Sequence, residues 1–573
     1  MKNIGYIRAT AAVSRAWGMA LIGFALLPAQ TGIHPGFTFA SLRPPGFAPM
    51  VGGLDFLPDG RLVVCTWDGF GKTKGTVWLV SGATTGDASK ITYAKFAEGL
   101  NEPLGAKVVD GRIHILQKDQ LSWLPDSNGD GKADGIRKVA SGWTVQPGTA
   151  QSLEFAMGLV HRDGAFFAGL ATNWPLTAKH SNERGCIIRM APPDTGFSNF
   201  ACGLRTPNGL VLGPGGELFT TENQGNWVPS SKLVHVKAGR FYGVHKPVPG
   251  PYDAIPESPP AIWLDHGSIG ISPTQPVYLE AGPFKGQMLA GDNRLGTLQR
   301  YFLEQVAGEW QGAVFRFSGG LEAGANRIVS GPDGAVYVGG IGTQEWGGWD
   351  WNGKNSGLQR LAANGKPFFD MLAVRSLGAT RMEVEFTAPS GAAAGVPGNY
   401  QVRQWNYIPE AGYGLGKQPV QNLTVASVQL SADKRKAVLE IAGMKARHVV
   451  YLKIAGVASA ANEPLWGAEA WYTQNGFGPA APTVGALPPA ARGRKPGFSL
   501  LRGDGGGWRI RIAEDGPFSI ALIGLDGRSR ETLRGFGPTE LALQRESAAE
   551  PAIAVMHTGS GKSAARIVPG SMQ

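Results

Sequence analysis

Short runs of alternating apolar and polar residues recur through the first two thirds of the chain, each interrupted by a turn that contains glycine. Four of them read GGLDFLPDGRLVVCTW, GAKVVDGRIHILQ, GLVHRDGAFFAGLA and GLVLGPGGELFTTE, and two shorter ones read FKGQMLAGD and IVSGPDGAVYVGGI. A period of two is typical of β-strands, and glycine permits the tight turn of a hairpin. The turn glycines are Gly60, Gly111, Gly164, Gly216, Gly286 and Gly334.

These units repeat about every fifty residues, which is the spacing of propeller blades. One longer interval holds the proline-rich HKPVPGPYDAIPESPP, which cannot form a central strand. We therefore predict a six-bladed β-propeller over residues 40–365. A solenoid is the alternative, although no helical period separates the strands.

A different strand pattern follows the repeats. MEVEFTA, VASVQLS, KAVLEIAG and HVVYLKIAG predict an immunoglobulin-like β-sandwich over residues 371–477. Residues 478–497 are rich in Pro, Ala and Gly and read as a linker. Residues 498–573 predict a second small sandwich. The predicted fold class is all-β: a six-bladed β-propeller followed by two small β-sandwich domains.

The N-terminal residues predict export. Three basic residues precede WGMALIGFALLPA, so residues 1–30 have the organisation of a signal peptide, with an uncleaved anchor as the alternative. No later segment is apolar for long enough to span a bilayer. The expected locations are the periplasm, the cell surface or the extracellular space.

Charge and cysteine content exclude two classes of function. Loss of Lys2, Arg8 and Arg15 with the leader takes the formal charge of the 573-residue chain from +10 to +7. No basic run interleaved with aromatic residues accompanies this charge, so a nucleic-acid partner is not expected. No Cys-x-x-Cys-His motif occurs, which excludes covalent c-type haem within the chain.

The three cysteines lie in strand-like segments. Cys186 and Cys202 flank the turn PPDTG, so adjacent strands place them opposite each other, either as an export-compatible disulfide or as two buried thiols. Cys65, within RLVVCTW, is expected to be a core residue.

The segment FTTENQGNWVPSSKL, residues 219–233, begins as a strand and continues into amides, a glycine and a tryptophan. Loops that leave propeller strands crowd one face, so these groups are expected to line a central funnel. The alternative is structural, with the amides capping loop backbone and Trp227 packed between blades.

This segment carries a family resemblance. GLRTPNGLVLGPGGELFTTENQG resembles the signature of the soluble quinoprotein glucose/sorbosone dehydrogenases, over about residues 45–363. EFAMGL, NQGNWVPSSKL, GLQRL and NYQVRQWNY are similar to an exported sorbosone-dehydrogenase-like sub-family that is often joined to cytochrome c domains. The C-terminal end, with LDGR and GSGKSAARIV, resembles type IX secretion sorting domains, and a fibronectin-like module is the alternative.

The resemblance implies pyrroloquinoline quinone (PQQ), calcium, a sugar or sugar-aldehyde substrate and a cytochrome c electron acceptor. Arginines of this family hold the cofactor carboxylates, as planar bidentate donors do. Arg205 matches the signature arginine, and Arg294 in GDNRLG matches a later one more weakly. The resemblance also implies cofactor contacts at further positions: Asn208, Asn223, Gln224, Gly225 and Trp227.

The chain departs from the family at the catalytic position. The family has a histidine before the glycine of the third inner strand, where this chain reads QSLEFAMG. Glu154 is the titratable group there and is the candidate base, provided that burial raises its pKa. A salt-bridge role for Glu154 is the alternative. His161 lies further along the strand and is expected to be structural.

A second motif predicts a structural calcium site. DSNGDGKAD, residues 126–134, follows the D-x-N-x-D-G pattern in which oxygen ligands wrap a cation. Arg137 stands where an EF-hand has its glutamate, and strand-like segments flank the loop, so an EF-hand is excluded. A turn without metal is the alternative. The predicted ligands are Asp126, Asn128, Asp130, the Lys132 carbonyl and Asp134.

Three classes of function remain open. The first is a quinone-dependent oxidoreductase acting on a sugar or sugar aldehyde. The second is a non-catalytic glycan-binding propeller, consistent with the missing histidine and with funnel aromatics such as Trp227, Trp346, Trp349 and Trp351. The third is a polysaccharide lyase or hydrolase that uses Glu154 or Asp292. Fold alone does not choose among them.

Overall fold

The computed structural model describes residues 32–69, 74–145, 154–172, 181–246, 250–343, 350–414, 416–479, 498–502, 508–524, 529–542, 552–558 and 561–567. The predicted signal peptide lies outside these residues, as do Trp346, Trp349 and the predicted linker from residue 480 onward. The chain divides into two compact units, residues 1–479 and 480–573.

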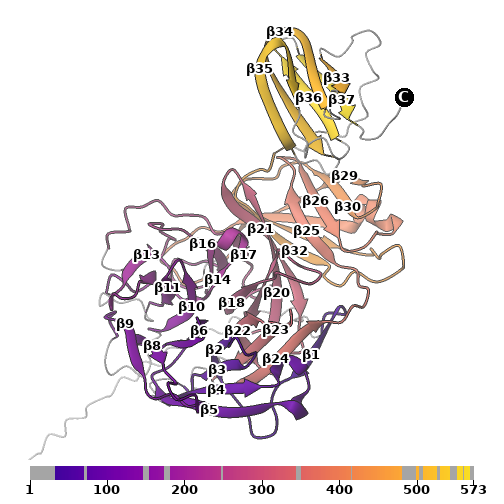
Figure 1. Cartoon of the computed structure of the whole chain (residues 1–573). Coiled ribbons are helices and arrows are strands. Elements are labelled where there is room, and N and C mark those ends of the chain that lie inside the picture. Colours follow the sequence, from indigo (N-terminus) through magenta and orange to yellow (C-terminus); the bar gives the residue numbers. More distant parts are fainter. Residues whose placement is uncertain are drawn as a thin grey trace, which may run out of the picture. The chain divides into compact units, whose positions relative to one another are not determined.

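Six four-stranded antiparallel blades form the first part of the chain, as the glycine repeat predicts. Their strands radiate in chain order around a common centre (Figure 1). The first three blades contain β2 (Val51–Phe56), β3 (Leu62–Thr66), β4 (Gly75–Ser81), β5 (Thr92–Leu100), β6 (Gly105–Val109), β7 (Arg112–Leu116), β8 (Gln120–Leu124), β9 (Arg137–Ser141), β10 (Ala156–Arg162), β11 (Ala165–Leu170), β12 (Cys186–Met190) and β13 (Ser198–Cys202).

The sixth blade closes the ring with a strand from the start of the chain. β1 (Phe37–Ser41) pairs with β24 (Ser356–Ala363), and the two lie side by side in Figure 1. The other strands of blades four to six are β14 (Pro207–Leu212), β15 (Leu218–Glu222), β16 (Ser231–Val236), β17 (Ile262–Leu264), β18 (Pro273–Tyr278), β19 (Met288–Asp292), β20 (Thr297–Val306), β21 (Glu309–Ser318), β22 (Gly324–Ser330) and β23 (Val336–Ile341). This closure leaves the sixth blade with no missing strand.

The repeat glycines are required by their backbone conformation. All six join the first and second strands of a blade and have a positive φ, between 73° and 86°. A side chain added at Gly60 or Gly111 would meet nothing within 4 Å, so the need for glycine there comes from φ and not from space. This local requirement explains why the sequence alone showed the number of blades.

The interfaces between neighbouring blades are apolar. Leu116, Phe166 and Ile188, for example, pack together between the second and third blades. Cys65 is a buried free thiol in such a core, as predicted. Cys186 and Cys202 are directly opposite each other on β12 and β13 and form a disulfide.

A β-sandwich follows the propeller and shares a sheet with it. β21 of the fifth blade pairs with β32, which extends that blade into an eight-stranded sheet. Trp405 and Trp471 of the sandwich pack in the same apolar cluster as Phe219 and Met288 of blades four and five. The sandwich strands are β25 (Met371–Ser376), β26 (Arg381–Phe386), β27 (Tyr400–Asn406), β28 (Gln418–Leu423), β29 (Val425–Leu430), β30 (Lys436–Ile441), β31 (His448–Ile454) and β32 (Glu469–Gln474).

The second unit contains one five-stranded sheet in which β34 pairs with β33, β35 and β36. Among the β34 residues whose side chains are described, Ile510, Ile512, Phe518, Ile520 and Leu522 are buried. Its strands are β33 (Phe498–Arg502), β34 (Trp508–Gly524), β35 (Ser529–Ala542), β36 (Ala552–Thr558) and β37 (Gly561–Ile567).

Helix is nearly absent from the described residues, as predicted. It is limited to 3-10 turns: η1 (Ala83–Thr85), η2 (Ala88–Lys90), η3 (Pro214–Gly216), η4 (Ala392–Gly395) and η5 (Pro397–Asn399). No helix in the described part of the chain has the length and apolar character to cross a membrane.

Candidate functional site

Most of the predicted site residues lie at one end of the propeller. In an antiparallel blade, the start of the first strand and the end of the second strand are at the same end. Glu154 precedes β10, Arg205 precedes β14, and Arg294 follows β19. Asn223, Gln224, Gly225 and Trp227 follow β15. We call this end the signature face, and the end with the repeat glycines the hairpin face.

Arg205 and Gly225 are in direct contact on the signature face. Arg205 is 6% exposed, and a Cβ added to Gly225 would lie 2.1 Å from its Nε. Only glycine permits this close approach. The ring of Tyr413, from the β-sandwich, lies 5.4 Å from the guanidinium carbon. Among the described residues Arg205 has no carboxylate ion-pair partner, and its Nη1 donates to the Thr206 hydroxyl at 3.3 Å.

A buried carboxylate holds the segment that carries Arg205. Glu222, at the end of β15, accepts hydrogen bonds from the backbone N–H groups of Arg205 (3.0 Å) and Thr206 (2.8 Å). Burial raises the pKa of Glu222, and these two hydrogen bonds and the nearby Lys232 ammonium oppose the shift. The role of Glu222 is therefore to fix the loop before β14.

Asp292 has the same role in the fifth blade. Its Oδ2 accepts from the N–H groups of Ile271 (2.7 Å) and Ser272 (2.9 Å), and its Oδ1 accepts from Arg294 (3.0 Å) and Leu295 (2.8 Å). Burial raises the pKa of Asp292. Both oxygens are engaged by backbone, so the geometry does not favour Asp292 as an acid or base for a lyase.

The turn after β15 is engaged by the β-sandwich. The backbone N–H of Trp227 donates to the Glu410 carbonyl at 2.9 Å, and its ring lies 4.7 Å from that of His245, edge to face. A Cβ added to Gly414 would lie 2.4 Å from Gln224 Nε2. Asn223 Nδ2 donates to the Gln224 carbonyl at 3.4 Å. The polar turn that the sequence singled out therefore contacts another domain of the same chain.

Several buried polar atoms of the signature face lack partners. Asn293 follows β19 and is fully buried, and neither its Oδ1 nor its Nδ2 has a hydrogen-bond partner among the described residues. Oδ2 of Asp350, which is 4% exposed, and Oδ1 of Asn223 also have no hydrogen-bond partner among the described residues. Arg294 is exposed and donates from Nη1 to the Asp350 carbonyl at 2.7 Å. Because an unpaired buried polar group is costly, these atoms need an explanation.

Glu154 lies beside a buried arginine. It is 1% exposed, and its charge opposes the effect of burial on Arg184, whose pKa falls to about 10. Arg184 donates to the backbone carbonyls of Thr144 and Phe155. This environment matches the salt-bridge alternative more closely than an accessible base.

The part of the signature face around Glu154 is apolar. Trp67, Leu104, Phe155, Met157 and Ile341 form one cluster with Ala171. Its members come from blades one, two, three and six.

A buried arginine lies between the two faces. Arg327, on β22, donates to the carbonyls of Gly52 (2.8 Å) and Leu104 (2.8 Å), and to Asn208 Oδ1 (2.7 Å). These partners belong to blades one, two and four, so one side chain bridges the centre of the ring. Burial lowers the pKa of Arg327 to about 10. Asn208, predicted as a cofactor contact, is thus a partner of Arg327.

The far side of this arginine opens on the hairpin face. A pocket of about 170 Å³ there is lined by residues of all six inner strands, among them Asp55, Lys107 and Gln275. His161 also lines it, so this histidine is at the wrong end to act with the signature-face residues. His161 lies within strand β10, as the sequence predicted.

The predicted calcium loop also belongs to the hairpin face. Asp126 accepts from the N–H groups of Gly129 (2.9 Å) and Gly131 (3.1 Å), and Asp130 accepts from Lys132 N–H at 2.8 Å. Asp134 accepts from Ser127 N–H, and the pKa of Asp134 falls because Ser127 hydrogen-bonds to it. In the described residues no three His, Cys, Asp or Glu side chains are grouped to hold a metal. The side chains as they stand satisfy the loop backbone.

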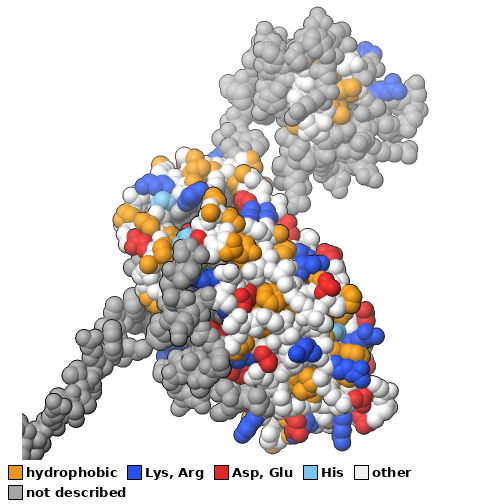
Figure 2. Space-filling view, turned by 90° about the vertical axis from the view of Figure 1, so that its left-hand side faces the viewer, with side chains coloured by type: hydrophobic (Ala, Val, Ile, Leu, Met, Phe, Trp, Pro, Cys, Tyr) orange, Lys and Arg blue, Asp and Glu red, His pale blue; other side chains and the backbone are white. Residues whose placement is uncertain are grey.

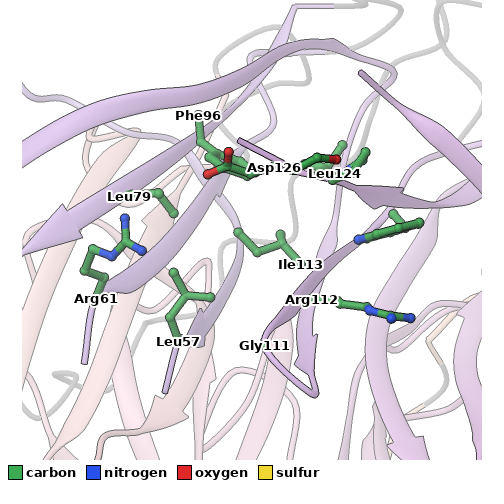
Figure 3. Close-up of a pocket in the computed structure, with 12 residues that line it drawn as sticks. Leu57, Arg61, Leu79, Phe96, Gly111, Arg112, Ile113, Leu124 and Asp126 are labelled. Carbon is green, nitrogen blue, oxygen red and sulfur yellow. The ribbon is translucent and has the colours of Figure 1, made fainter. Parts of the chain in front are cut away.

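Asp126 lines a pocket of about 350 Å³ between the first two blades. Figure 3 shows its apolar floor, which includes Leu57, Leu79 and Ile113, with Arg61 and Arg112 on opposite sides. Arg61 pairs with Asp59, and Arg112 lies over the Trp123 ring. The charged groups of this pocket therefore have partners.

Residues 52–242 match a family described as a domain of unknown function, DUF7133. No curated protein matches the sequence.

Solved structures similar to this chain include three sugar-related proteins. An oxidoreductase of Thermus thermophilus described as a glucose dehydrogenase is 18% identical, with a TM-score of 0.43, over 57% of this chain and 100% of its own. The PQQ-bound aldose sugar dehydrogenase of Streptomyces coelicolor is 18% identical, with a TM-score of 0.41, over 57% and 99%. A calcium structure of a Trichoderma reesei family AA12 carbohydrate-active enzyme is 12% identical, with a TM-score of 0.41, over 59% and 99%.

Proposed function

We propose that the signature face binds a sugar or sugar aldehyde and that the protein is an exported, quinone-dependent sugar oxidoreductase. The observation that carries the sugar site is Asn293, which is fully buried while both of its amide atoms lack partners among the described residues. Sugar hydroxyls both donate and accept, so they complement this amide and the Asp350 carboxylate oxygen that has no hydrogen-bond partner among the described residues.

The quinone part of the proposal rests on Arg205 and Gly225. The Gly225 backbone covers one region of the guanidinium, and no carboxylate of the described chain forms an ion pair with it. An acidic cofactor such as PQQ supplies carboxylates for such a group, and Arg294 offers a second, exposed guanidinium. Bound PQQ would supply a hydride acceptor for oxidation of the sugar. Arg205 would orient the cofactor, while Asn293 and Asp350 would hold the substrate hydroxyls.

Calcium enters the proposal at two places. The resemblance to quinoproteins points to backbone carbonyls near Gln224 and Gly225, and the 126–134 loop is a separate structural candidate. Export through the N-terminal leader and electron transfer to a cytochrome c complete the proposal.

A reconstitution experiment tests this function. The purified protein is titrated with PQQ in the presence of calcium, and bound cofactor is detected by its absorbance. Arg205→Ala should weaken binding about tenfold to a hundredfold, because a charge-assisted hydrogen bond contributes about 1.5–3 kcal/mol. Arg189→Ala, at an exposed position of β12, is the matched control and should bind as the wild type does. Absence of any bound quinone in the wild-type protein contradicts the oxidoreductase.

A non-catalytic glycan-binding propeller is the second candidate. The observation that favours it is the position of Glu154, which is buried beside Arg184 instead of being accessible to substrate. This candidate predicts sugar binding without quinone binding and without oxidation. The same titration, repeated with sugars alone, separates the two.

A further inference from the structure

A loop of the β-sandwich covers the turn after β15. This sandwich loop, residues 407–414, lies between β27 and β28. Asn226 Nδ2 donates to the Ala411 carbonyl at 2.9 Å, and Gly414 N–H donates to the Gly225 carbonyl at 3.2 Å. With the bond from Trp227 N–H to the Glu410 carbonyl, three hydrogen bonds join the loop to the turn. The loop therefore has a defined register on the signature face.

The base of the sandwich loop is anchored to the propeller. The Tyr407 hydroxyl donates to Asp265 Oδ1 at 2.7 Å, and Lys417 Nζ lies 2.8 Å from Asp265 Oδ2. The Tyr407 ring also packs against Trp263, with 5.0 Å between the ring centroids. Because Asp265 and Tyr407 are both buried, these contacts fix the position of the loop.

Tyr413, in the middle of this fixed loop, has an exposed ring. It is 53% exposed, more than any other large hydrophobic side chain among the described residues. Its ring lies 5.4 Å from the Arg205 guanidinium, within the range of a cation–π contact. An aromatic ring that is held in place and left open to solvent is suited to pack against the apolar face of a ligand.

We propose that Tyr413 is a specificity-determining residue of the signature-face site, and that its ring is the platform for one sugar ring of a glycan with two or more rings. This inference rests on the proposed sugar site. Tyr413 lies over the turn of blade four, whereas Asn293 contacts the start of the inner strand of blade six through Gly324. Asn293 follows β19 of blade five, so a ligand that contacts both residues extends across more than one blade.

A purely structural role for the sandwich loop makes a different prediction. The three hydrogen bonds to the turn use Asn226 and backbone groups and do not involve the Tyr413 ring. If the loop only covers the turn, removal of the ring changes nothing in ligand binding. If the ring is the platform, its removal weakens glycans of several rings and spares the monosaccharide.

The test compares Tyr413→Ala, Tyr413→Phe and the control Val420→Ala, which changes another exposed residue of the sandwich. The wild-type protein is first screened on an array of immobilised glycans of one to six sugar rings. The best-bound glycan and its terminal monosaccharide are then titrated by calorimetry. We expect Tyr413→Ala to bind the glycan about fivefold to tenfold more weakly, and the monosaccharide as the wild type does. Tyr413→Phe should retain binding.

Each other outcome overturns the inference in a recognisable way. Equal glycan binding by the wild type and Tyr413→Ala removes the platform but leaves the sugar site standing. Tighter binding by Tyr413→Ala means that the ring shields the site. Failure of the wild type to bind any glycan or sugar contradicts the proposed function itself. Thermal unfolding of each variant confirms that the change at this exposed position leaves the fold intact.

Discussion

Two groups of polar residues, one at each end of the propeller, differ in how the described chain satisfies them. On the hairpin face, Asp126 and Asp130 accept hydrogen bonds from backbone amides of their own loop, and Asp55 pairs with Lys107 at 2.8 Å. On the signature face, Asn293 and Asp350 are buried with atoms that have no partner among the described residues. Polar groups of the first kind are satisfied by their own loop or by a neighbouring blade. Groups of the second kind are those on which the proposed sugar site rests.

The surface charge does not make this distinction. Lys, Arg, Asp and Glu side chains are interspersed over the face drawn in Figure 2, with no extended patch of one sign among the described residues. The +10 formal charge is therefore uninformative about the site. Buried Asn293 and Asp350, and not surface charge, define the candidate site.

Arg327 lies between the two ends of the propeller. Its replacement should have the largest effect on the stability of the protein. Arg327→Met leaves Asn208 and the carbonyls of Gly52 and Leu104 without a donor, so we expect a loss of about 3 kcal/mol in the free energy of unfolding. Chemical denaturation measures this. Arg61→Met, on the hairpin face, removes a half-exposed pair with Asp59 and should cost less than about 1 kcal/mol. Equal losses contradict a special role for Arg327.

The disulfide at the signature end should have the next largest effect. Replacement of Cys186 and Cys202 by serine opens a loop with a sequence separation of 16, which removes about 3 kcal/mol of stabilisation. Under reducing conditions the melting temperature of the wild type should fall to that of the double variant. The melting temperature of the double variant should not respond to the reductant. Cys65→Ser is not an equivalent control, because Cys65 is buried in the core.

The sequence predicted the fold because its signals are local. A glycine with positive φ at Gly60 and at each equivalent turn, together with alternating apolar residues, fixes one hairpin per blade. The pairing of β21 with β32 was not predicted, because it joins residues that are far apart in the chain. The unusual length of β20 and β21 was the one available signal, since each has ten residues.

The candidate site was predicted only in part. Arg205 and the turn after β15 follow from the signature motif, and their common face follows from strand order. Asn293, Asp350 and Tyr413 were missed, because a missing partner or a contact from a distant domain cannot be read from neighbouring residues. Arg327 was missed for the same reason, since its partners come from three blades.

Asn293 gives a sharper test of the comparison between the two ends. Asn293→Leu removes an amide without partners among the described residues, so stability should stay the same or rise slightly. Sugar binding should weaken about tenfold, because the hydrogen bonds to the ligand are lost. Gln474→Leu, which removes another buried amide with an unpaired oxygen in the β-sandwich, is the control and should not affect binding. Unchanged sugar binding by Asn293→Leu contradicts the proposed site.

Calcium should have the smallest effect on stability, and this effect should arise at the hairpin face. If the 126–134 loop binds calcium, Asp130→Ala should lower the melting temperature only when calcium is present, by an amount equivalent to about 1 kcal/mol. Wild-type protein in a chelator should melt like the variant. An equal loss with and without calcium shows that Asp130 serves only the turn, where it accepts from Lys132 N–H.

Hydrogen–deuterium exchange with and without ligand tests the central claim most directly, because it reports which end of the propeller a ligand protects. The full-length protein is measured alone, with PQQ and calcium, and with the best-bound sugar. The account predicts slower exchange in peptides that contain residues 223–227, 292–296 and 350–351. It predicts no change in peptides from the glycine hairpins of the opposite face, such as residues 57–61. Protection confined to the hairpin face, or no protection anywhere despite bound ligand, would contradict it.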